Sequence, residues 1–568
     1  MPSLLDQRMT GTMAALTAPG GMLPVATAPS KWGIDLPFIA AAPPTLVAYM
    51  AHFANEHRDA TFLVAGSERL TYGEVHAVAG RVAQGLVAHG VRRGDRVGIA
   101  MRNSPAWIAT YMGVLIAGGV ATLLNGWWQA EELAAAVHDV ECSLIVADEP
   151  RVKRLAAISH LPPVLEIDDL RPLAQAVAPL TVDRDVPLPE LGPDDWATIL
   201  FTSGSTGLSK GAISTHRAVV QGVFNYLAQA MMMMGLATQD GNPPQGQPST
   251  LLNVPLFHVT AEVPVFLQSF AMGRKLVLMP KWDAEEAMRL IQQEGVTYFV
   301  GVPLMSYEIL NHPRRSNYDL SSVTDFAAGG APRPAEHVKR IKEEMGSDTG
   351  GAPLIGYGLT ETNGVGTGNW RDNYLAKPNS AGLPSKPLVD LAILDDGGRP
   401  VAAGARGEVG IRTIANFAEY WGNPEATAAA FTADGYFLTG DIGYLDEDGY
   451  LFIVDRKKDI IIRGGENISC QEVEAALYLH PRVAEAAVFG LADERFGEVP
   501  GAVVHLADGE TLDEGALQQF LGEHIAAFKV PARIWFAPQA LPRLGTEKID
   551  KVGLRKTYRE AWAGERSD

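Results

Sequence analysis

Short apolar runs with strand character alternate with helical segments along most of this 568-residue chain. The strand-like runs include residues 96–101, 141–148, 198–202, 275–279 and 297–302. The alternation predicts an α/β fold, because a helix after each strand returns the chain to the start of the next strand of a largely parallel sheet. No similarity recurs at a fixed period, so the pattern does not indicate a repeat array.

The length of the chain and a change in the pattern of predicted helices and strands along it predict several domains. A chain of 568 residues exceeds what one hydrophobic core usually organises. Glycine and proline interrupt residues 1–32, which predicts a loose N-terminal arm. Residues 33–455 carry the α/β pattern and predict a large N-terminal domain of mostly parallel sheets flanked by helices. After that the elements become short and mixed, so residues 456–568 predict a small α+β domain.

The composition limits the partners and the compartment. The formal net charge is -19 and the pI is about 5.2, which argues against nucleic acid or an anionic membrane as the main partner. The two cysteines, Cys142 and Cys470, are too few for a disulfide framework or a thiolate metal cluster. They fit a reducing compartment, and the first residues lack the pattern of a secretion signal, so we expect a cytoplasmic protein. The sequence leaves a homodimer open.

Residues 107–124 are uncharged and reach the lower limit of a membrane-spanning length. They include Gly118 and Gly119, which favour a buried helix that turns into a strand over a membrane span. We therefore expect no transmembrane segment. The methionines at 231–234 and the polar run 239–249 predict a helix end followed by an exposed loop.

A loop rich in glycine and hydroxyl groups, TSGSTGLSKG at 202–211, follows the apolar run 198–202 directly. Glycines let backbone N–H groups converge on an anion, and hydroxyls and a lysine add donors and charge. A Walker loop needs glycine before its lysine, but Ser209 precedes Lys210, so a P-loop NTPase is disfavoured. A flexible linker is also disfavoured, because the loop is joined to a strand. The predicted phosphate-binding residues are Thr202, Ser203, Gly204, Ser205, Thr206, Gly207 and Lys210.

Two further glycine-containing turns follow apolar runs, at 329–332 (GGAP) and 357–361 (YGLTE). Ligands of α/β proteins bind at such strand ends.

These motifs stand in one order with YFLTGD at 436–441, VDRKKD at 454–459 and LPRLGTEKIDK at 541–551. In this order they resemble the adenylate-forming superfamily, which contains acyl- and aryl-CoA synthetases, luciferases and the adenylation domains of peptide synthetases. The resemblance covers residues 45–558 and is greatest to bacterial fatty-acid or aryl-acid CoA ligases. It implies ATP, Mg²⁺ and coenzyme A as cofactors and co-substrates. It also implies that the C-terminal domain is mobile and rotates about a hinge at Lys458 between two half-reactions.

The resemblance assigns roles in nucleotide binding. The backbone at Gly330 and Ala331 would border the adenine, and Tyr357 would stack on its face. Thr360 would reach the α-phosphate and Glu361 would hold Mg²⁺. The predicted ATP or AMP contacts beyond the phosphate loop are Gly330, Ala331, Pro332, Tyr357, Gly358, Asp441 and Arg456, the last two at the ribose.

The resemblance also assigns catalytic roles. Lys548 would enter the site for adenylation, where an ammonium offsets the repulsion between a carboxylate and the α-phosphate. Glu547 replaces a more common glycine, and Lys551 is the alternative lysine. His258, in PLFHVT at 255–260, would lie near the acid's carboxylate. Asn467 would lie near the reacting thioester. The predicted lining of the coenzyme A channel is Gly464, Gly465 and Glu466.

The predicted acyl pocket is apolar or small in character, and no arginine or lysine is among its members to receive a second carboxylate. Its predicted members are His258, Val259, Val263, Gly301, Val302, Met305, Ala328, Gly329 and Gly356. Such a pocket predicts a hydrophobic carboxylic acid, either a medium- or long-chain fatty acid or a bulky aryl or steroid-type acid, because burying apolar surface is favourable.

Other functions are left open by the sequence. The acyl group could pass to a separate carrier protein, although no carrier domain follows Lys548. A luciferase-type partial reaction shares the motifs. A nucleotide-binding regulator that has lost catalysis would show no acid-dependent pyrophosphate exchange, and an NTPase would release ADP instead of AMP.

Overall fold

The computed structural model describes residues 2–156, 158–202, 209–329, 333, 335–345, 351–463, 466–507, 509–544 and 548–565. The described residues form two compact units. The first consists of residues up to 202, 209–391 and 411–437, and the second of residues 392–410 and 438–565. The predicted domain boundary at residue 456 stays a prediction.

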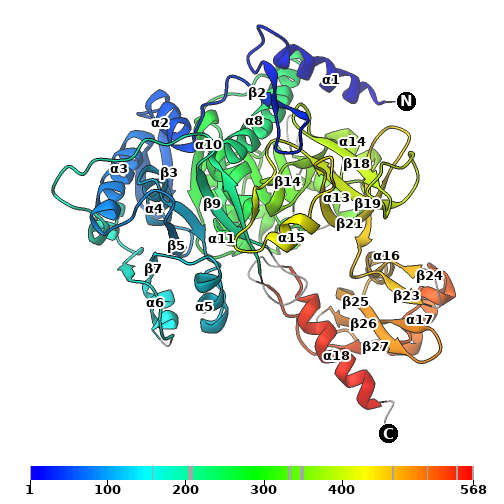
Figure 1. Ribbon diagram of the computed structural model, residues 1–568. Coiled ribbons are helices and arrows are strands. Elements are labelled where there is room, and N and C mark those ends of the chain that lie inside the picture. Colours follow the sequence, from blue (N-terminus) through cyan, green and yellow to red (C-terminus); the bar gives the residue numbers. More distant parts are fainter. Residues whose placement is uncertain are drawn as a thin grey trace. The chain divides into compact units, whose positions relative to one another are not determined.

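The first unit contains two large sheets (Figure 1). One sheet has seven strands in the order β20-β10-β9-β6-β5-β7-β8. Their bounds are β5 Arg96–Ala100, β6 Val120–Leu123, β7 Leu144–Asp148, β8 Val164–Ile167, β9 Trp196–Phe201, β10 Gly211–Thr215 and β20 Glu419–Tyr420. The pairs β9–β6, β6–β5, β5–β7 and β7–β8 are parallel, whereas β10 turns back antiparallel to β9.

The other sheet has nine strands in the order β17-β16-β15-β14-β13-β11-β12-β3-β4. Their bounds are β3 Thr61–Ala65, β4 Glu68–Thr71, β11 Ser249–Leu252, β12 Lys275–Leu278, β13 Tyr298–Gly301, β14 Asp325–Gly329, β15 Ala352–Gly358, β16 Gly366–Trp370 and β17 Leu383–Pro384. The centre of this sheet, from β3 to β15, is parallel. A separate two-stranded ribbon pairs β1 Val25–Pro29 with β2 Asp35–Ile39.

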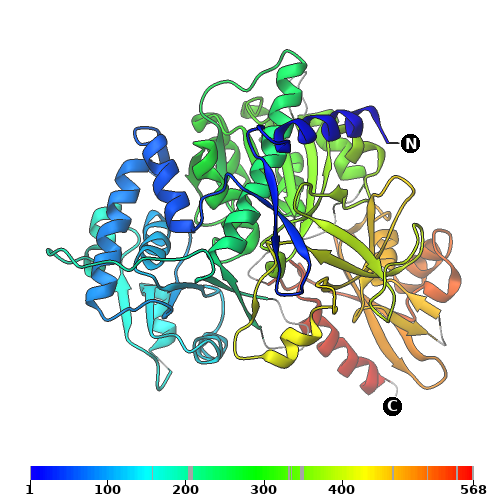
Figure 2. The same ribbon diagram turned by 45° about the horizontal axis from the view of Figure 1, so that its top comes forward.

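Helices flank these sheets (Figures 1 and 2). Their bounds are α1 Leu4–Thr17, α2 Leu46–Glu56, α3 Tyr72–Ala88, α4 Pro105–Ile116, α5 Ala130–Asp139, α6 Glu149–Leu155, α7 Leu173–Ala176, α8 His216–Gln239, α9 Val259–Ala261, α10 Gln268–Met272, α11 Ala284–Glu294, α12 Pro303–Asn311, α13 Ala335–Arg340, α14 Arg371–Ala376 and α15 Pro424–Ala429. Short 3₁₀ or π turns are η1 Ala178–Leu180, η2 Glu262–Leu267, η3 Arg315–Asn317, η4 Ile341–Met345 and η5 Thr360–Thr362.

The second unit contains two smaller sheets. One is a four-stranded sheet in the order β18-β19-β21-β22. Its strands are β18 Asp390–Leu394, β19 Gly407–Arg412, β21 Phe437–Leu445 and β22 Leu451–Arg456. The strands β18, β19 and β21 each begin or end in the first unit. The other sheet contains β23 Ile461–Arg463, β24 Glu466–Ile468, β25 Val483–Asp493, β26 Gly497–Leu506 and β27 Arg533–Phe536. The helices are α16 Cys470–Leu477, α17 Glu514–Gly522, η6 Ala527–Lys529 and α18 Lys551–Glu565. The predicted α/β fold, with a large N-terminal and a small C-terminal part, is confirmed.

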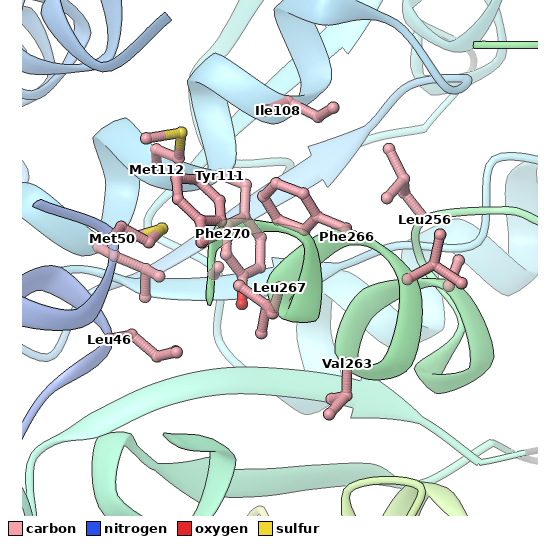
Figure 3. Close-up of a cluster of buried hydrophobic side chains, with 14 of the residues drawn as sticks. Leu46, Met50, Ile108, Tyr111, Met112, Leu256, Val263, Phe266, Leu267 and Phe270 are labelled. Atoms are coloured by element: carbon pink, nitrogen blue, oxygen red, sulfur yellow. The ribbon is translucent and has the colours of Figure 1, made fainter. Parts of the chain in front are cut away.

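One large apolar core joins the two sheets of the first unit. It includes Val97 of β5 and Leu252 of β11, which belong to different sheets. Figure 3 shows that side chains of α2, α4, η2 and α10 point toward one another within this core. Tyr111 and Phe266 form one of its edge-to-face ring contacts, with centroids 5.3 Å apart. This packing fixes the helices that cover the nine-stranded sheet.

The uncharged segment 107–124 forms most of α4 and then β6, as predicted, and Trp107 is fully buried. Among the described residues, α8 is the one helix that is long and apolar enough to cross a membrane by length and composition. Its apolar window is 72% buried, as in the core helix of a soluble protein.

The predicted loose N-terminal arm instead contains the helix α1, which side-chain contacts hold against the rest of the first unit. Ser3 and Asp6 form reciprocal side-chain to backbone hydrogen bonds of 3.0 Å that cap α1. Asn373 donates to Asp6 at 2.8 Å, and Arg8 pairs with Asp240 at 2.6 Å. Figures 1 and 2 both show α1 beside α8, which it contacts. The glycines and prolines that suggested a loose arm lie mostly after this helix.

Candidate active site

The carboxyl ends of parallel strands in the nine-stranded sheet bring several predicted residues together. Gly329 ends β14 and pairs with Gly356 of β15. Tyr357 lies next on β15, and Thr360 and Glu361 form the following 3₁₀ turn η5. Loops at this edge of a parallel sheet meet in space, which makes the edge the usual ligand site of α/β proteins.

A cavity of about 1630 Å³ begins at this edge and follows the strands. Gly329 and Gly356 line it at the carboxyl end, and Tyr298 and Asp325 line it at the amino end of neighbouring strands. Side chains of α8, including Phe224, line it as well. The helix α1 contributes Ser3, Leu4, Leu5 and Arg8 to the lining.

The predicted acyl-pocket residues divide into two groups. Val259, Ala328, Gly329 and Gly356 line the cavity. His258, Val263, Gly301, Val302 and Met305 do not belong to its lining. Val263 is fully buried in the main core, and Met305 packs in a second core cluster with Phe299 and Phe326. A side chain on an inward-facing turn can point into packed core instead of into the cavity, and the sequence does not distinguish the two.

His258 is half-buried beside the cavity and caps a short helix. It accepts a hydrogen bond from the Thr260 backbone N–H at 3.2 Å, and its Nδ1 lies 3.0 Å from Thr260 Oγ1. Thr260 lines the cavity. The imidazole is therefore held by the turn that follows β11, next to the carboxyl ends of the central strands.

Lys210, Tyr420 and Glu361 form a cluster from three distant segments. The Lys210 ammonium lies 4.8 Å from the centre of the Tyr420 ring, and the Tyr420 hydroxyl donates to Glu361 Oε1 at 2.7 Å. Tyr420 reaches this position because β20 pairs with β10, where Tyr420 is opposite Ala212. Burial, the first cause, and the adjacent Glu361 carboxylate raise the pKa of Tyr420, so its hydroxyl remains a donor.

The Glu361 carboxylate has the character that a hard divalent cation requires. It is an oxygen ligand, it is 8% exposed, and it is next to the loop between β9 and β10. Within the described ranges no group of three His, Cys, Asp or Glu side chains could hold a metal. A cation at Glu361 would therefore take its other ligands from phosphate oxygens and water.

The backbone around Glu361 has no room for additional atoms. A Cβ on Gly358 would lie 1.9 Å from the carbonyl oxygen of Gly364, well inside any real contact. Asn363 adopts a left-handed conformation (φ 49°), and its amide donates to the Ala415 carbonyl at 2.7 Å and to Ser214 at 3.1 Å. These contacts fix the turn that carries Thr360 and Glu361.

The second unit brings Asp441, Arg456 and Lys548 together. Strands β21 and β22 place Asp441 directly opposite Arg456, with 3.1 Å between Oδ1 and Nε. Lys548 is half-buried beside them. Burial and then the Arg456 charge lower the pKa of Lys548 to about 8, against the opposing effect of Asp441.

The alternative lysine, Lys551, has another partner. Its ammonium lies 2.6 Å from Glu474, at the start of α18. Lys458, the predicted hinge, lies on the exposed turn between β22 and β23, where Asp459 and Ile460 donate backbone hydrogen bonds to Arg456. Glu466 begins β24 and pairs with Arg463 of β23.

Other predicted site residues lie outside the described part of the chain. They are Ser203, Gly204, Ser205, Thr206, Gly207, Gly330, Ala331, Pro332, Gly464 and Gly465, together with the side chain of Asn467. Thr202 and Lys210 flank the phosphate loop and are joined by a 3.0 Å backbone hydrogen bond. The loop therefore joins two strands that form an antiparallel pair.

Sequence reasoning missed three features of this region. Tyr420 sits in a strand of two residues, far from any motif, although its pairing with β10 places it at Lys210. Arg274 lines the cavity and follows Gly273, outside the motifs. The helix α1 also lines the cavity, and its Ser3-x-x-Asp6 capping pattern was the available signal.

Comparisons with known proteins identify the family of the chain. The model of the AMP-binding enzyme family matches residues 50–421, and that of the AMP-binding enzyme C-terminal domain matches residues 472–548. A feruloyl-CoA synthase of Amycolatopsis sp is 36% identical over 88% of this chain and 96% of its own. A long-chain-fatty-acid–CoA ligase of Bacillus subtilis is 32% identical over 89% and 93%. The o-succinylbenzoate CoA synthetase of Bacillus subtilis, solved with its acyl-adenylate intermediate, has a TM-score of 0.77 at 26% identity and covers 89% and 97%.

The chain belongs to the AMP-binding enzyme family, as the predicted adenylate-forming resemblance implied. Within it, the protein is an AMP-forming acid–CoA ligase that uses ATP, Mg²⁺ and coenzyme A. These predictions of class and cofactors are confirmed.

We predict that Gly358→Ala destabilises the protein strongly, because its Cβ would overlap the Gly364 carbonyl oxygen. The free energy of unfolding should fall by about 3 kcal/mol, the upper range for overpacking. Chemical denaturation at equilibrium measures this.

Gly356→Ala on the same strand is the matched control, since the nearest atom to its Cβ would be 3.8 Å away. Its unfolding midpoint should stay close to that of the parent protein. Equal midpoints for both variants would contradict the steric argument.

Proposed function

We propose that the acid substrate is hydrophobic, either a medium- or long-chain fatty acid or a bulky aryl or steroid-type acid. The observation that carries this proposal is the cavity of about 1630 Å³ that begins beside Gly329 and Gly356. Its walls include Phe224, Leu227 and Met233 of α8. A feruloyl-CoA synthase and a long-chain-fatty-acid–CoA ligase among the relatives support an acid of this kind. We also propose a cytoplasmic location, supported by the free thiols of Cys142 and Cys470.

The reaction has two steps in this proposal. A carboxylate oxygen of the acid attacks the α-phosphorus of ATP, and the bond to pyrophosphate breaks. The coenzyme A sulfur then attacks the carbonyl carbon of the acyl-adenylate, AMP leaves, and the thiol proton passes to solvent. The adenylate is required because AMP is a far better leaving group than a carboxylate oxygen is. No general base is needed for the first step, since the carboxylate is already ionised near neutral pH.

In the large domain, Tyr357 and Gly358 would contact the base, Thr360 the α-phosphate, and Thr202 and Lys210 the β- and γ-phosphates. The cluster of Lys210, Tyr420 and Glu361 supports this arrangement. Glu361 would hold Mg²⁺, which neutralises phosphate charge when bound. Tyr420 would orient this carboxylate through its hydroxyl, and its ring would position the ammonium of Lys210. His258 would lie beside the acid's carboxylate.

In the small domain, Asp441 and Arg456 would bind the ribose, and Lys548 would stabilise charge during adenylation. The ion pair of Asp441 with Arg456 and the nearby Lys548 support this assignment. The pairing of Lys551 with Glu474 favours Lys548 over Lys551. Residues 456–568 would rotate about Lys458, after which Glu466 and Asn467 would line the path of the thiol.

A panel of acids tests the proposed substrate class. Pyrophosphate release and acyl-CoA formation would be measured for short-chain, long-chain, cinnamic-type and steroid-type acids at matched concentrations. We expect the highest kcat/KM among the hydrophobic acids. A preference for short, strongly polar acids such as acetate would refute the proposal.

We predict that Lys548→Ala slows adenylation by about a hundredfold or more while thiolation of supplied acyl-adenylate changes little. The reason is that the ammonium acts on the α-phosphate only in the first half-reaction. The two half-reactions are assayed separately, by pyrophosphate exchange and by acyl-CoA formation from acyl-AMP. Lys556→Ala on α18 is the control, and equal damage to both half-reactions would overturn the role of Lys548.

We predict that kcat/KM for ATP in adenylation falls as the pH rises through about 8. The pKa of Lys548 in the free enzyme is about 8, so its catalytic charge is present below that pH and lost above it. Lys548→Arg keeps its charge over this range and should lack the alkaline limb, although its rate is lower. A parent profile that stays level from pH 7 to about 9.5 would show that this titration does not control adenylation.

A further inference from the structure

Arg274 is a buried cation in the wall of the acid cavity. Helix α10 ends at Met272, and Gly273 turns the chain in the left-handed conformation (φ 57°), so that Arg274 stands just before β12. The arginine is 4% exposed and lines the cavity. The adjacent Lys275 behaves differently, because its ammonium pairs with Glu294 at 3.2 Å.

The guanidinium of Arg274 has few acceptors among the residues that the structure describes. Its Nη1 lies 3.4 Å from the Pro264 carbonyl oxygen, and its Nη2 contacts the thioether sulfur of Met272. Its Nε is buried without a hydrogen-bond partner. A guanidinium has five N–H donors, so these two contacts leave most of the donors of Arg274 without an acceptor in the described part of the chain.

Other arginines of the same cavity have carboxylate partners. Arg8 pairs with Asp240 at 2.6 Å, and Arg371 lies 3.6 Å from Asp325. No ion pair is formed by Arg274 within the described ranges. Its guanidinium instead lies 5.2 Å from the centre of the Tyr298 ring. Burial lowers the pKa of Arg274, but a guanidinium in a protein keeps its proton.

Arg274 lies at the part of the cavity that is remote from the carboxyl ends of the strands. Tyr298 pairs with Asp325 at the amino end of β14, and Gly329 is four residues farther along that strand. At about 3.3 Å per residue, the two ends are roughly 13 Å apart. Arg274, which lies against the Tyr298 ring, is therefore at the amino-end part of the cavity, remote from the edge where the proposed carboxylate reacts.

We infer that Arg274 binds an acceptor oxygen, of a carbonyl or a second carboxylate, on the part of the acid remote from the reacting carboxylate. This inference rests on the proposed function and refines it. The substrate is then apolar along its middle and carries one oxygen group near its far end. The oxygen would receive the N–H groups that the protein leaves without acceptors.

The physical basis is the cost of buried donors without partners. A buried polar group that lacks a hydrogen bond destabilises the bound state, so an acid without the oxygen gains less from the cavity. Sites that hydrogen-bond a substrate oxygen discriminate strongly against analogues that lack it. Bonds from a charged donor are also stronger than neutral ones.

The test compares dodecanoic acid with its ω-oxo acid and with dodecanedioic acid, whose extended chains are about as long as the separation of roughly 13 Å between the two strand ends. The parent protein, Arg274→Met, Arg274→Lys and the control Lys275→Met are assayed for acyl-CoA formation. We expect the parent to favour at least one oxygen-bearing acid over dodecanoic acid by about tenfold or more in kcat/KM. Whichever of the two oxygen-bearing acids has the higher kcat/KM identifies the remote oxygen as that of a carbonyl or of a carboxylate.

Arg274→Met should lose that preference, with kcat/KM for the oxygen-bearing acid about tenfold to a hundredfold lower and that for dodecanoic acid unchanged or higher. Lys275→Met should keep the preference of the parent. Arg274→Lys should lose part of it, and this variant decides the question if Arg274→Met does not fold.

An unchanged ratio between acids in a folded Arg274 variant, or a parent that favours dodecanoic acid, would overturn the inference while acyl-CoA formation itself continues. Failure of the proposed function is a different result, namely no acyl-CoA from any hydrophobic acid of the panel.

Discussion

The contact between the backbones of Gly358 and Gly364 is the constraint on which the large-domain site depends. A carbonyl oxygen lies where any side chain at position 358 would begin, so the end of β15 and the turn after it have one arrangement. That arrangement presents Tyr357, Thr360 and Glu361 at the carboxyl edge of the sheet. The Glu361 carboxylate of this turn then accepts a hydrogen bond from Tyr420 of β20, and Lys210, which precedes β10 of the neighbouring sheet, lies over the ring of that tyrosine. A steric exclusion thus fixes the electrostatics of a site built from two sheets.

The nine-stranded sheet provides separate places for the reacting groups and for the rest of the acid in the proposed function. Glycines at the carboxyl ends of β14 and β15 leave space for a reacting group, whereas the body of the strands forms one wall of the cavity that we propose for the acid. The residues proposed to bind the nucleotide include charged and polar side chains, whereas the cavity is mostly apolar. Members of the family can therefore use different acids while their nucleotide motifs stay the same. For this reason the motifs predicted the reaction, whereas the choice of acid depends on the cavity.

Much of the fold and the chemistry was predictable from local pattern, and the remainder depends on distant packing. Alternating apolar runs predicted the parallel strands, and the ordered motifs predicted the class of enzyme and its cofactors. The pocket was less predictable, because Val263 and Met305 turn into packed core while Arg274, outside any motif, lines the cavity. Tyr420 was missed because a strand of two residues has no periodicity to detect. The arm was wrongly predicted as loose, because its partners Asn373 and Asp240 lie far away in sequence.

The anchoring of α1 also has a consequence for the order of events on the ribosome. Asp6 is joined to Asn373, which is 367 positions later in the chain. At about 5–20 residues per second, translation needs about 20–70 s to cover that interval. Helix α1 can meet α8 and Asp240 before this time, but its hydrogen bond to Asn373 of α14 can form only after it. The cavity that it helps to line is completed only when most of the large domain has already emerged.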